Sequence, residues 1–111
     1  MAKSTSFTCF TDLATEVTPP EDGTLSRTLH NDDNAKIVLF GFAAGEELSE
    51  HTASMPAILQ IIKGEGTLTI GDETVAGQPG TLVHMAAKVP HSVKAQTPLV
   101  MLLTLLKAAG S

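Results

Sequence analysis

Residues 45–64 read GEELSEHTASMPAILQIIKG, a stretch that begins and ends with glycine and carries one histidine, His51. Residues 80–91 read GTLVHMAAKVPH and again run from a glycine to a histidine, His91. The two histidines are about forty positions apart, so both can face one cavity only if the chain folds back on itself. Because the segments between them have the pattern of strands, the two stretches predict a small β-barrel with a polar spot inside.

The rest of the chain is a series of short apolar or alternating segments, most of which end at glycine, aspartate, asparagine or proline. This pattern is typical of strands joined by tight turns, and it predicts an all-β antiparallel sandwich or barrel. Gly71-Asp72 suits a two-residue type II′ hairpin turn, because glycine stands at the first central position. Only residues 12–17 have a weak helical pattern. We expect strands at residues 25–30, 36–43, 48–53, 57–63, 67–70, 73–76, 81–85, 91–94 and 99–106.

With 111 residues, 42% of them hydrophobic, the chain has the size of one domain that encloses a core without disulfides or a structural metal. Residues 1–24 are polar and rich in serine and threonine, and we expect an irregular arm there with one short edge strand around residues 7–10. The arm would wrap around the barrel or around a neighbouring subunit. The barrel is expected at residues 25–106 and a C-terminal tail at residues 107–111.

The composition excludes several classes of partner. The formal charge is −5 and lysine and arginine form no cluster, whereas nucleic-acid binding is built from many basic contacts. The most apolar stretch, residues 99–106, is far shorter than the roughly 20 residues that span a bilayer. Cys9 is the single cysteine and no signal peptide is recognisable, so we expect a cytoplasmic protein without disulfides that binds neither nucleic acid nor a membrane.

Two of the expected strands are apolar on both faces. In residues 57–63 both alternating sets of side chains are mainly apolar, and residues 99–106 have almost no polar side chain. Strands of this kind are covered on both sides. The second cover is another sheet of the same fold or a second subunit, and a two-fold homodimer is the commonest arrangement. We therefore expect a homodimer.

The two glycine-to-histidine stretches resemble the motifs of the cupin family, whose members form a jelly-roll or double-stranded β-helix barrel. The first motif has a glycine, two histidines, a glutamate and a glycine at fixed spacing, and the second has a glycine, a proline, a glycine, a histidine and an asparagine. Half of these ten positions agree, namely Gly45, His51, Gly64, Gly80 and His91. The others hold Ala53, Ala57, Ala86, Lys88 and Ala95. The resemblance covers residues 25–106. In its local sequence around the motifs, the chain looks like small, RmlC-like, single-domain bacterial cupins of uncharacterised function.

Cupins that hold iron, manganese, nickel or zinc usually bind the metal through three histidines and one glutamate, so the resemblance carries over only His51 and His91 as metal ligands. Two imidazoles fall short of the three protein ligands of a catalytic zinc or non-haem iron site. On an extended strand Glu50 points away from the face of His51, and Glu47 shares that face but lies about 13 Å away along the chain. Neither glutamate substitutes well for the missing ligand.

Three functions from different classes fit these residues, and no residue is singled out as catalytic. The first is a metal-free pocket in which His51 and His91 bind a small organic acid or an aromatic ligand. The second is a metal-dependent enzyme of the dioxygenase or isomerase type, in which water or substrate completes the ligand set. The third is a barrel that only dimerises. The histidine pair is expected near a wall of Met55, Leu59, Ile61, Val83 and Met85, whose two thioethers would suit copper(I).

The remaining histidines and the cysteine have simpler interpretations. The position after His84 usually points inward in cupins, so the resemblance places His84 on the outer face or at an interface. His30 ends an early strand beside the loop signature NDDN of residues 31–34 and is expected to be solvated. Cys9 has no adjacent basic residue that would make it a reactive thiol.

Overall fold

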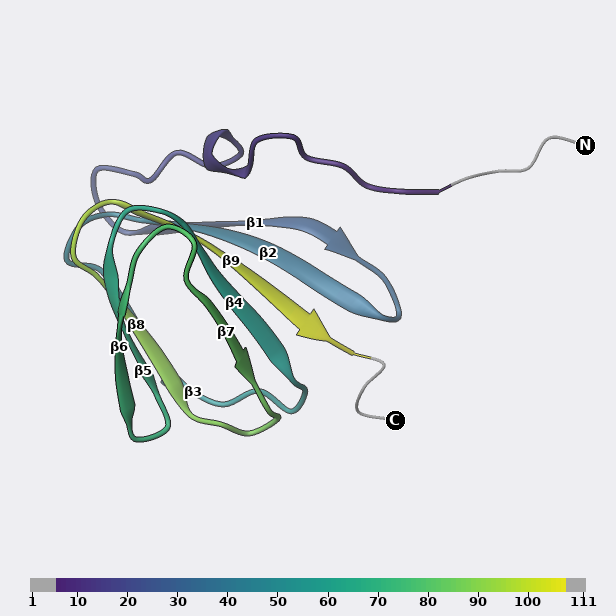
Figure 1. Ribbon diagram of the computed structural model, residues 1–111. Coiled ribbons are helices and arrows are strands. Elements are labelled where there is room, and N and C mark those ends of the chain that lie inside the picture. Colours follow the sequence, from purple (N-terminus) through teal and green to yellow (C-terminus); the bar gives the residue numbers. More distant parts are fainter. Residues whose placement is uncertain (1–5, 108–111) are drawn as a thin grey trace, which may run out of the picture.

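The computed structural model describes residues 6–107 as nine strands and one short 3-10 helix (Figure 1). The helix, η1, spans Leu13–Thr15. The expectation of an all-β fold is confirmed, because each expected strand of the barrel overlaps an observed one. No helix within residues 6–107 is long and apolar enough to cross a membrane. The strands are β1 (Thr24–Asn31), β2 (Ala35–Phe42), β3 (Glu47–His51), β4 (Ala57–Lys63), β5 (Gly66–Ile70), β6 (Glu73–Gly77), β7 (Leu82–Met85), β8 (His91–Ala95) and β9 (Leu99–Leu106).

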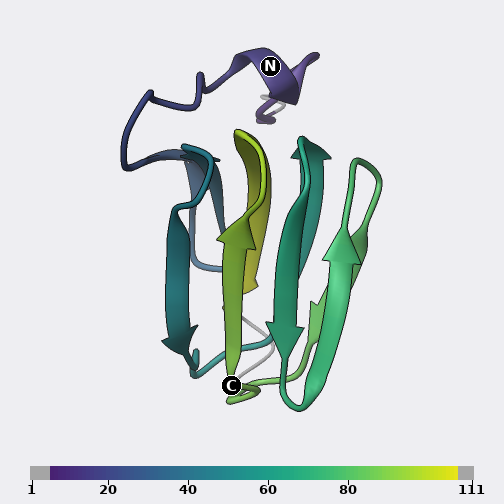
Figure 2. The same ribbon diagram turned by 90° about the vertical axis from the view of Figure 1, so that its left-hand side faces the viewer.

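The strands form two antiparallel sheets that face each other as the layers of a jelly roll (Figures 1 and 2). One sheet has the order β1-β2-β9-β4-β7 and the other the order β3-β8-β5-β6. The hairpin of β5 and β6 closes at Gly71-Asp72, where the sequence predicts a turn. Neighbours in the sheets are often distant in sequence, so each sheet joins strands from both halves of the chain.

Alternation along β9 separates two apolar clusters. Leu99 and Met101 belong to the core between the two sheets. Val100 and Leu102 point the other way and pack with Leu39 on the outer face of the five-stranded sheet. Both faces of β9 are therefore buried, as its sequence predicts. Burying one such side chain stabilises the fold by about 1.5–3 kcal/mol. A shift of β9 by one residue in register would exchange its two packed faces and lose these contacts, so it is strongly disfavoured.

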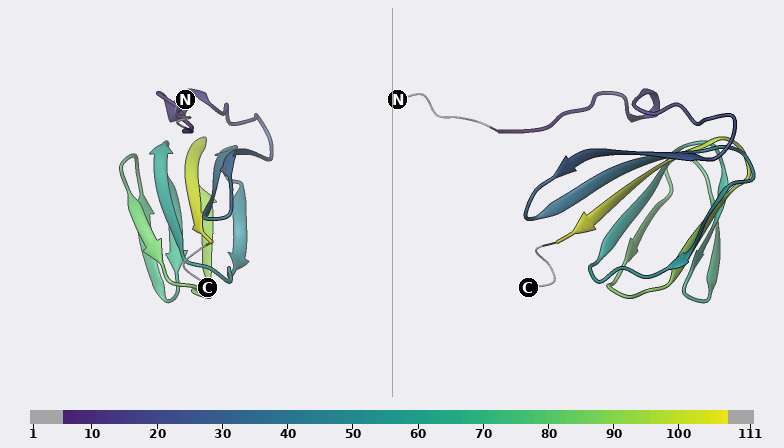
Figure 3. Two further views of the ribbon diagram at one scale, coloured as in Figure 1. Left: turned by 90° about the vertical axis from the view of Figure 1, so that its right-hand side faces the viewer. Right: turned by 180° about the vertical axis from the view of Figure 1, so that it is seen from behind.

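The N-terminal arm covers the outer apolar cluster. Leu13 and Val17 pack against it, and Figure 3 shows the arm running along the outer side of β1 and β2. Gly41 allows this close approach, because a Cβ atom at that position would lie 3.2 Å from Pro19 Cα. The arm thus buries part of the outer face of the strands that are apolar on both sides.

Residues 7–10 form no strand, so the expected edge strand in the arm is wrong. This segment lies over the face of the five-stranded sheet, where its backbone has no strand edge to pair with (Figure 3). The weak helical pattern at residues 12–17 appears as the three-residue η1.

Candidate functional site

His51 and His91 are brought together, as the sequence predicts. His51 ends β3, His91 begins β8, and the two residues are direct partners in the antiparallel ladder. Their ring centroids are 4.2 Å apart with the ring planes at 61°, an edge-to-face contact. His91 shares its face of β8 with Val93, which belongs to the core between the sheets. Because direct partners in a ladder point to the same face, both imidazoles are on the inner side of the barrel.

A β-bulge in β3 turns His51 inward. The ladder pairs Leu48 with Val93 and then shifts register, so that one extra residue of β3 precedes the partnership of His51 with His91. The expectation that Glu47 shares the face of His51 is therefore wrong. Leu48 shares that face instead and packs against the core. Bulges are common beside functional sites because they re-aim a side chain without ending the sheet.

The histidine pair lies where the strands end, at one mouth of the barrel. His91 is 4% exposed, whereas His51 is exposed. Two loops meet beside them, because the backbone N–H of Lys88 donates to the carbonyl of Ala53 at 2.8 Å. This bond links the loop after β7 to the loop after β3. A molecule entering this end would therefore meet one buried imidazole and one open to solvent.

Backbone carbonyls fix where both rings carry a proton. His51 Nδ1 lies 2.9 Å from the carbonyl oxygen of Ser49, and His91 Nδ1 lies 3.0 Å from that of Val89. A carbonyl oxygen only accepts, so each Nδ1 is the donor. In the neutral imidazoles each Nε2 then holds a lone pair. The site can accept two hydrogen bonds, take up a proton, or ligate a metal through these nitrogens.

The donor set around the pair is too small for a complete metal centre. Within the described part of the chain, no three or more histidine, cysteine, aspartate or glutamate side chains are grouped to hold a metal. Where the first cupin motif has its second histidine and its glutamate, this chain has Ala53 and Ala57. Two imidazoles do not reach the three protein ligands of catalytic zinc or non-haem iron. The residues present therefore do not fit the usual cupin metal.

The residues expected to form a wall beside the histidines lie mostly in the packed core. Leu59, Ile61 and Met85 are at most 3% exposed, and Val83 packs against the same cluster. Met55 is half-buried in the loop between β3 and β4. The core residues support the inner side of the barrel, and the contact of all five with a ligand stays a prediction.

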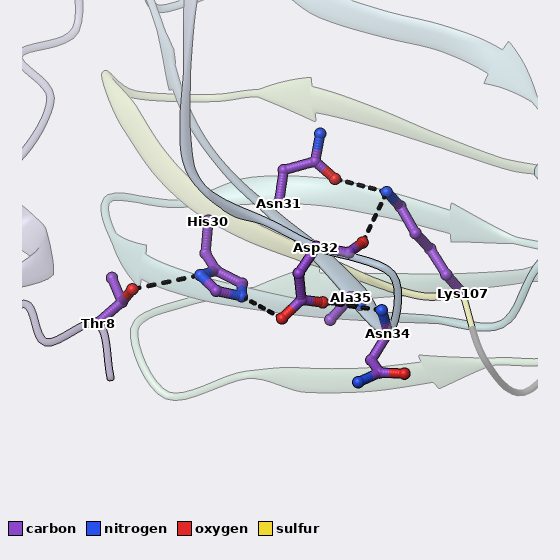
Figure 4. Close-up of polar contacts among 7 residues, drawn as sticks. All are labelled: Thr8, His30, Asn31, Asp32, Asn34, Ala35 and Lys107. Carbon is purple, nitrogen blue, oxygen red and sulfur yellow. Dashed lines mark hydrogen bonds and ion pairs between the residues drawn. The ribbon is translucent and has the colours of Figure 1, made fainter. Parts of the chain in front are cut away.

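His84 is exposed on β7, as expected, and Cys9 is exposed in the arm. His30, near the end of β1, is half-buried, and its two ring nitrogens contact Thr8 and Asp32 (Figure 4). The acidic residue two positions after His30 is the one sequence signal for this network. Thr8 is 22 positions away in the arm, and nothing in the sequence indicates that contact.

Lys88 supports the alignment of the second cupin motif. Its φ angle is 70°, and it is the one non-glycine residue between residues 6 and 107 with positive φ. The motif has a glycine at this position, and glycine adopts positive φ without steric cost. The turn before His91 therefore has the backbone shape of the motif although a lysine stands there.

Residues 38–105 match the family model described as the cupin domain. The chain belongs to the cupin family. The expectation of a small single-domain cupin with a jelly-roll barrel is confirmed by this match and by the solved structures that the chain resembles. No curated protein matches this cupin.

This cupin is similar to a conserved protein of unknown function from Streptococcus pyogenes, with 30% identity, coverage of 95% of this chain and 92% of that one, and a TM-score of 0.81. It is also similar to a cupin superfamily protein from Desulfitobacterium hafniense, with 29% identity, coverage of 85% and 86%, and a TM-score of 0.80. A salicylate 1,2-dioxygenase from Pseudoaminobacter salicylatoxidans has 18% identity, coverage of 75% and 25%, and a TM-score of 0.70, a likeness of fold alone.

Proposed function

We propose that this cupin binds a small organic molecule at the open end of its barrel, with His51 and His91 as its polar anchors. The observation that carries the proposal is the convergence of two imidazoles whose Nδ1 atoms are held by carbonyls and whose Nε2 atoms are left to accept. A phenol can donate its O–H to one Nε2, and an organic acid can give its proton to an imidazole and then accept the resulting N–H, so both kinds of ligand suit these nitrogens.

The unequal burial of the two rings gives them different roles. His91, at 4% exposed, makes the shielded hydrogen bond, which is stronger because the surroundings are less polar than water. His51 is exposed and contacts the outer side of the ligand. Met55, Leu59, Ile61, Val83 and Met85 form the apolar side of the proposed pocket.

The second candidate is a metal-dependent enzyme of the dioxygenase or isomerase type. One observation favours it. Backbone carbonyls hold the Nδ1 atoms of both histidines, which leaves each Nε2 to bind a metal, and this arrangement is common among metal-ligating histidines. Iron, manganese, nickel, zinc or copper would be held by His51 and His91, with water or substrate as the remaining ligands. We rank this candidate second because the described residues supply two ligands only.

We further propose that the protein works as a cytoplasmic homodimer. Leu25 of β1 and Leu82 of β7 are 51% and 58% exposed, on the two edge strands of the larger sheet. These side chains could be buried by a second copy, together with the part of the outer face that the arm leaves uncovered. A dimerising barrel without any ligand is the third candidate.

A thermal-shift experiment tests the proposal. Untagged protein is analysed for metal content, treated with a chelator and then screened against small carboxylic acids and phenols, since a ligand that binds the folded state raises Tm. We expect a Tm rise that disappears in His51→Ala and persists in His84→Ala. His84 is an exposed histidine on the outer face, so this variant controls for the loss of an imidazole.

The other possible outcomes of this experiment each support a different candidate function. Stoichiometric metal in the untagged protein, lost in His51→Ala and kept in His84→Ala, would support the metal-dependent enzyme. A screen in which no acid or phenol raises Tm would contradict the ligand site and leave the dimerising barrel.

A further inference from the structure

A cavity of about 360 Å³ lies on the outer side of the five-stranded sheet, between the sheet and the arm. Its polar lining comes from Thr8 of the arm and His30 of β1. Pockets for small molecules usually measure about 300–1,000 Å³ and combine an apolar lining with a few polar groups, so this cavity has the make-up of a small pocket. Its apolar lining consists of Phe10, Leu13, Leu29, Ile37 and Leu102.

Asp32 organises the polar groups beside this cavity (Figure 4). One carboxylate oxygen accepts the backbone N–H groups of Asn34 and Ala35 at 2.8 and 2.9 Å, and the other lies 2.7 Å from His30 Nε2. The hydrogen bond from His30, followed by those from the backbone, lowers the pKa of Asp32 to about 2. At neutral pH the carboxylate is therefore ionised and only accepts. His30 Nε2 must carry the proton of that bond.

The proton on Nε2 decides the direction of the next hydrogen bond. When Nε2 of a neutral imidazole carries the proton, Nδ1 is an acceptor. Thr8 Oγ1 lies 3.2 Å from His30 Nδ1, so beside a neutral His30 the threonine hydroxyl donates to the ring. A hydroxyl has one proton and two lone pairs, and the proton of Thr8 is already engaged. Thr8 is left with acceptor capacity, which selects a ligand whose polar group is a hydrogen-bond donor.

Within residues 6–107, no aspartate, glutamate, lysine or arginine side chain lines the cavity. Arg27 Nη1 bonds Glu16 Oε1 at 2.7 Å, and its guanidinium lies 5.8 Å from the centroid of the Phe10 ring. Lys107 Nζ donates to the side-chain oxygen of Asn31 and to the backbone carbonyl of Asp32, the latter at 2.9 Å. Because neither cation belongs to the cavity lining, the lining favours a neutral ligand over an ion.

We propose that this cavity is a second ligand site, which takes a small neutral molecule with an apolar body and one hydroxyl group, that is, a phenol or an aliphatic alcohol. The body contacts the apolar lining and the hydroxyl donates to Thr8 Oγ1. Leu102, which lines the cavity, faces outward from the sheet, whereas His51 and His91 face the interior. The second site therefore does not depend on the proposed function.

Three probes that share one ethylphenyl body test the proposal. 4-Ethylphenol carries the donor, ethylbenzene lacks it, and 4-ethylbenzoate replaces it with a negative charge. Binding is followed through the backbone amide signals of the full chain in NMR titrations. We expect 4-ethylphenol to shift the signals of Leu29, Ile37 and Leu102, to bind at least threefold more tightly than ethylbenzene and to bind at least tenfold more tightly than 4-ethylbenzoate.

Variants separate the hydrogen bond from the cavity. Thr8→Val keeps the shape of the side chain and removes its oxygen, so we expect 4-ethylphenol to bind about three- to tenfold more weakly and ethylbenzene to be unchanged within twofold. Thr11→Val, an exposed threonine of the same arm, is the matched control and should bind both probes as the unmodified chain does. Leu29→Trp should fill the cavity and abolish both interactions. His51→Ala should change neither.

Several results would overturn this second site. One is the absence of probe-induced shifts at the cavity residues; another is their persistence in Leu29→Trp. Equal affinity for 4-ethylphenol in Thr8→Val and in the unmodified chain would refute the role of the hydroxyl. If the probe binds only when dilution dissociates a dimer, a second copy of the chain occupies this face and the ligand site is refuted.

Discussion

His51 and His91 face each other across the β3–β8 ladder with ring centroids 4.2 Å apart, yet one ring is exposed and the other is 4% exposed. The contact exists because the bulge after Leu48 adds one residue to β3. If the register continued unshifted from the pair of Leu48 and Val93, Glu50 would oppose His91, and a carboxylate would take the place of the second imidazole. The bulge therefore decides the chemistry of the barrel mouth.

Replacing the two histidines should have unequal effects on stability. His91→Ala empties a buried position and leaves the carbonyl of Val89 without its N–H partner, so we expect a loss of about 1–3 kcal/mol. His51→Ala changes an exposed residue and should alter the free energy of unfolding by less than about 0.5 kcal/mol. Urea unfolding of the two variants measures the difference. Equal losses would contradict the burial described here.

Gly64 should tolerate no side chain. Its φ is 86°, and a Cβ atom there would lie 2.0 Å from the carbonyl oxygen of Pro98. We expect Gly64→Ala to cost about 3 kcal/mol or more, because the backbone of a neighbouring turn would have to move. Gly71→Ala is the control, since Gly71 also has positive φ but no atom within 4 Å of the added Cβ, and its cost should be about 1 kcal/mol. Thermal and urea unfolding of both variants test this ranking, and similar costs would contradict it.

Lys88→Gly should stabilise the chain. A side chain at φ 70° is strained, and glycine removes this strain while adding freedom to the unfolded chain. The balance is an expected gain of about 0.5–1 kcal/mol. Lys88→Ala removes the charge and keeps the strain, so its unfolding free energy should stay close to that of the unmodified chain. If alanine stabilises as much as glycine, the lysine charge is the cause and the backbone is not.

Asp32 should make stability depend on acidic pH. Hydrogen bonds from His30 and from the backbone N–H groups of Asn34 and Ala35 lower the pKa of Asp32 from 3.8 to about 2. The folded state thus favours the ionised carboxyl, and its contribution is present above the unfolded value and lost as the pH falls from 3.8 toward 2.

The Tm difference between the unmodified chain and Asp32→Asn should therefore be constant above about pH 5 and shrink below pH 4. Thermal unfolding at a series of pH values measures it. Asp33→Asn removes a carboxylate one position away and leaves the hydrogen bonds of Asp32 in place, so this control should not reproduce the trend. An NMR titration that places the Asp32 midpoint near 4 would contradict the prediction.

Local patterns in the sequence were sufficient for the strands and for the meeting of His51 with His91. Short apolar segments between turn residues are specified by neighbouring positions, and the spacing of the two cupin motifs identifies the barrel. The bulge in β3 was not predictable, because it depends on the register against β8, some forty residues away. Strict alternation therefore assigned Glu47 to the wrong face.

The arm and the outer cavity depend on contacts that leave no local pattern. Residues 7–10 have the composition of an edge strand, but the apolar face of β2 and β9 draws the arm across the sheet. The network of His30 needs Thr8 from that arm, and the cavity exists only once the arm has docked. A sequence pattern describes one segment at a time, whereas the cavity is lined jointly by the arm, β1, β2 and β9.

β9 lies in the middle of the larger sheet, between β2 and β4, although it is the last strand in the described chain. During synthesis on the ribosome, the β1–β2 pair and the β4–β7 pair stay separate until residues 99–106 join them, because β2 and β4 both pair with β9. Long-range pairing of this kind is slow, and the unpaired edges of β2 and β4 are prone to aggregate meanwhile. The arm docks on Val100 and Leu102, so although it is translated before every strand of the barrel, it can dock only after the last one.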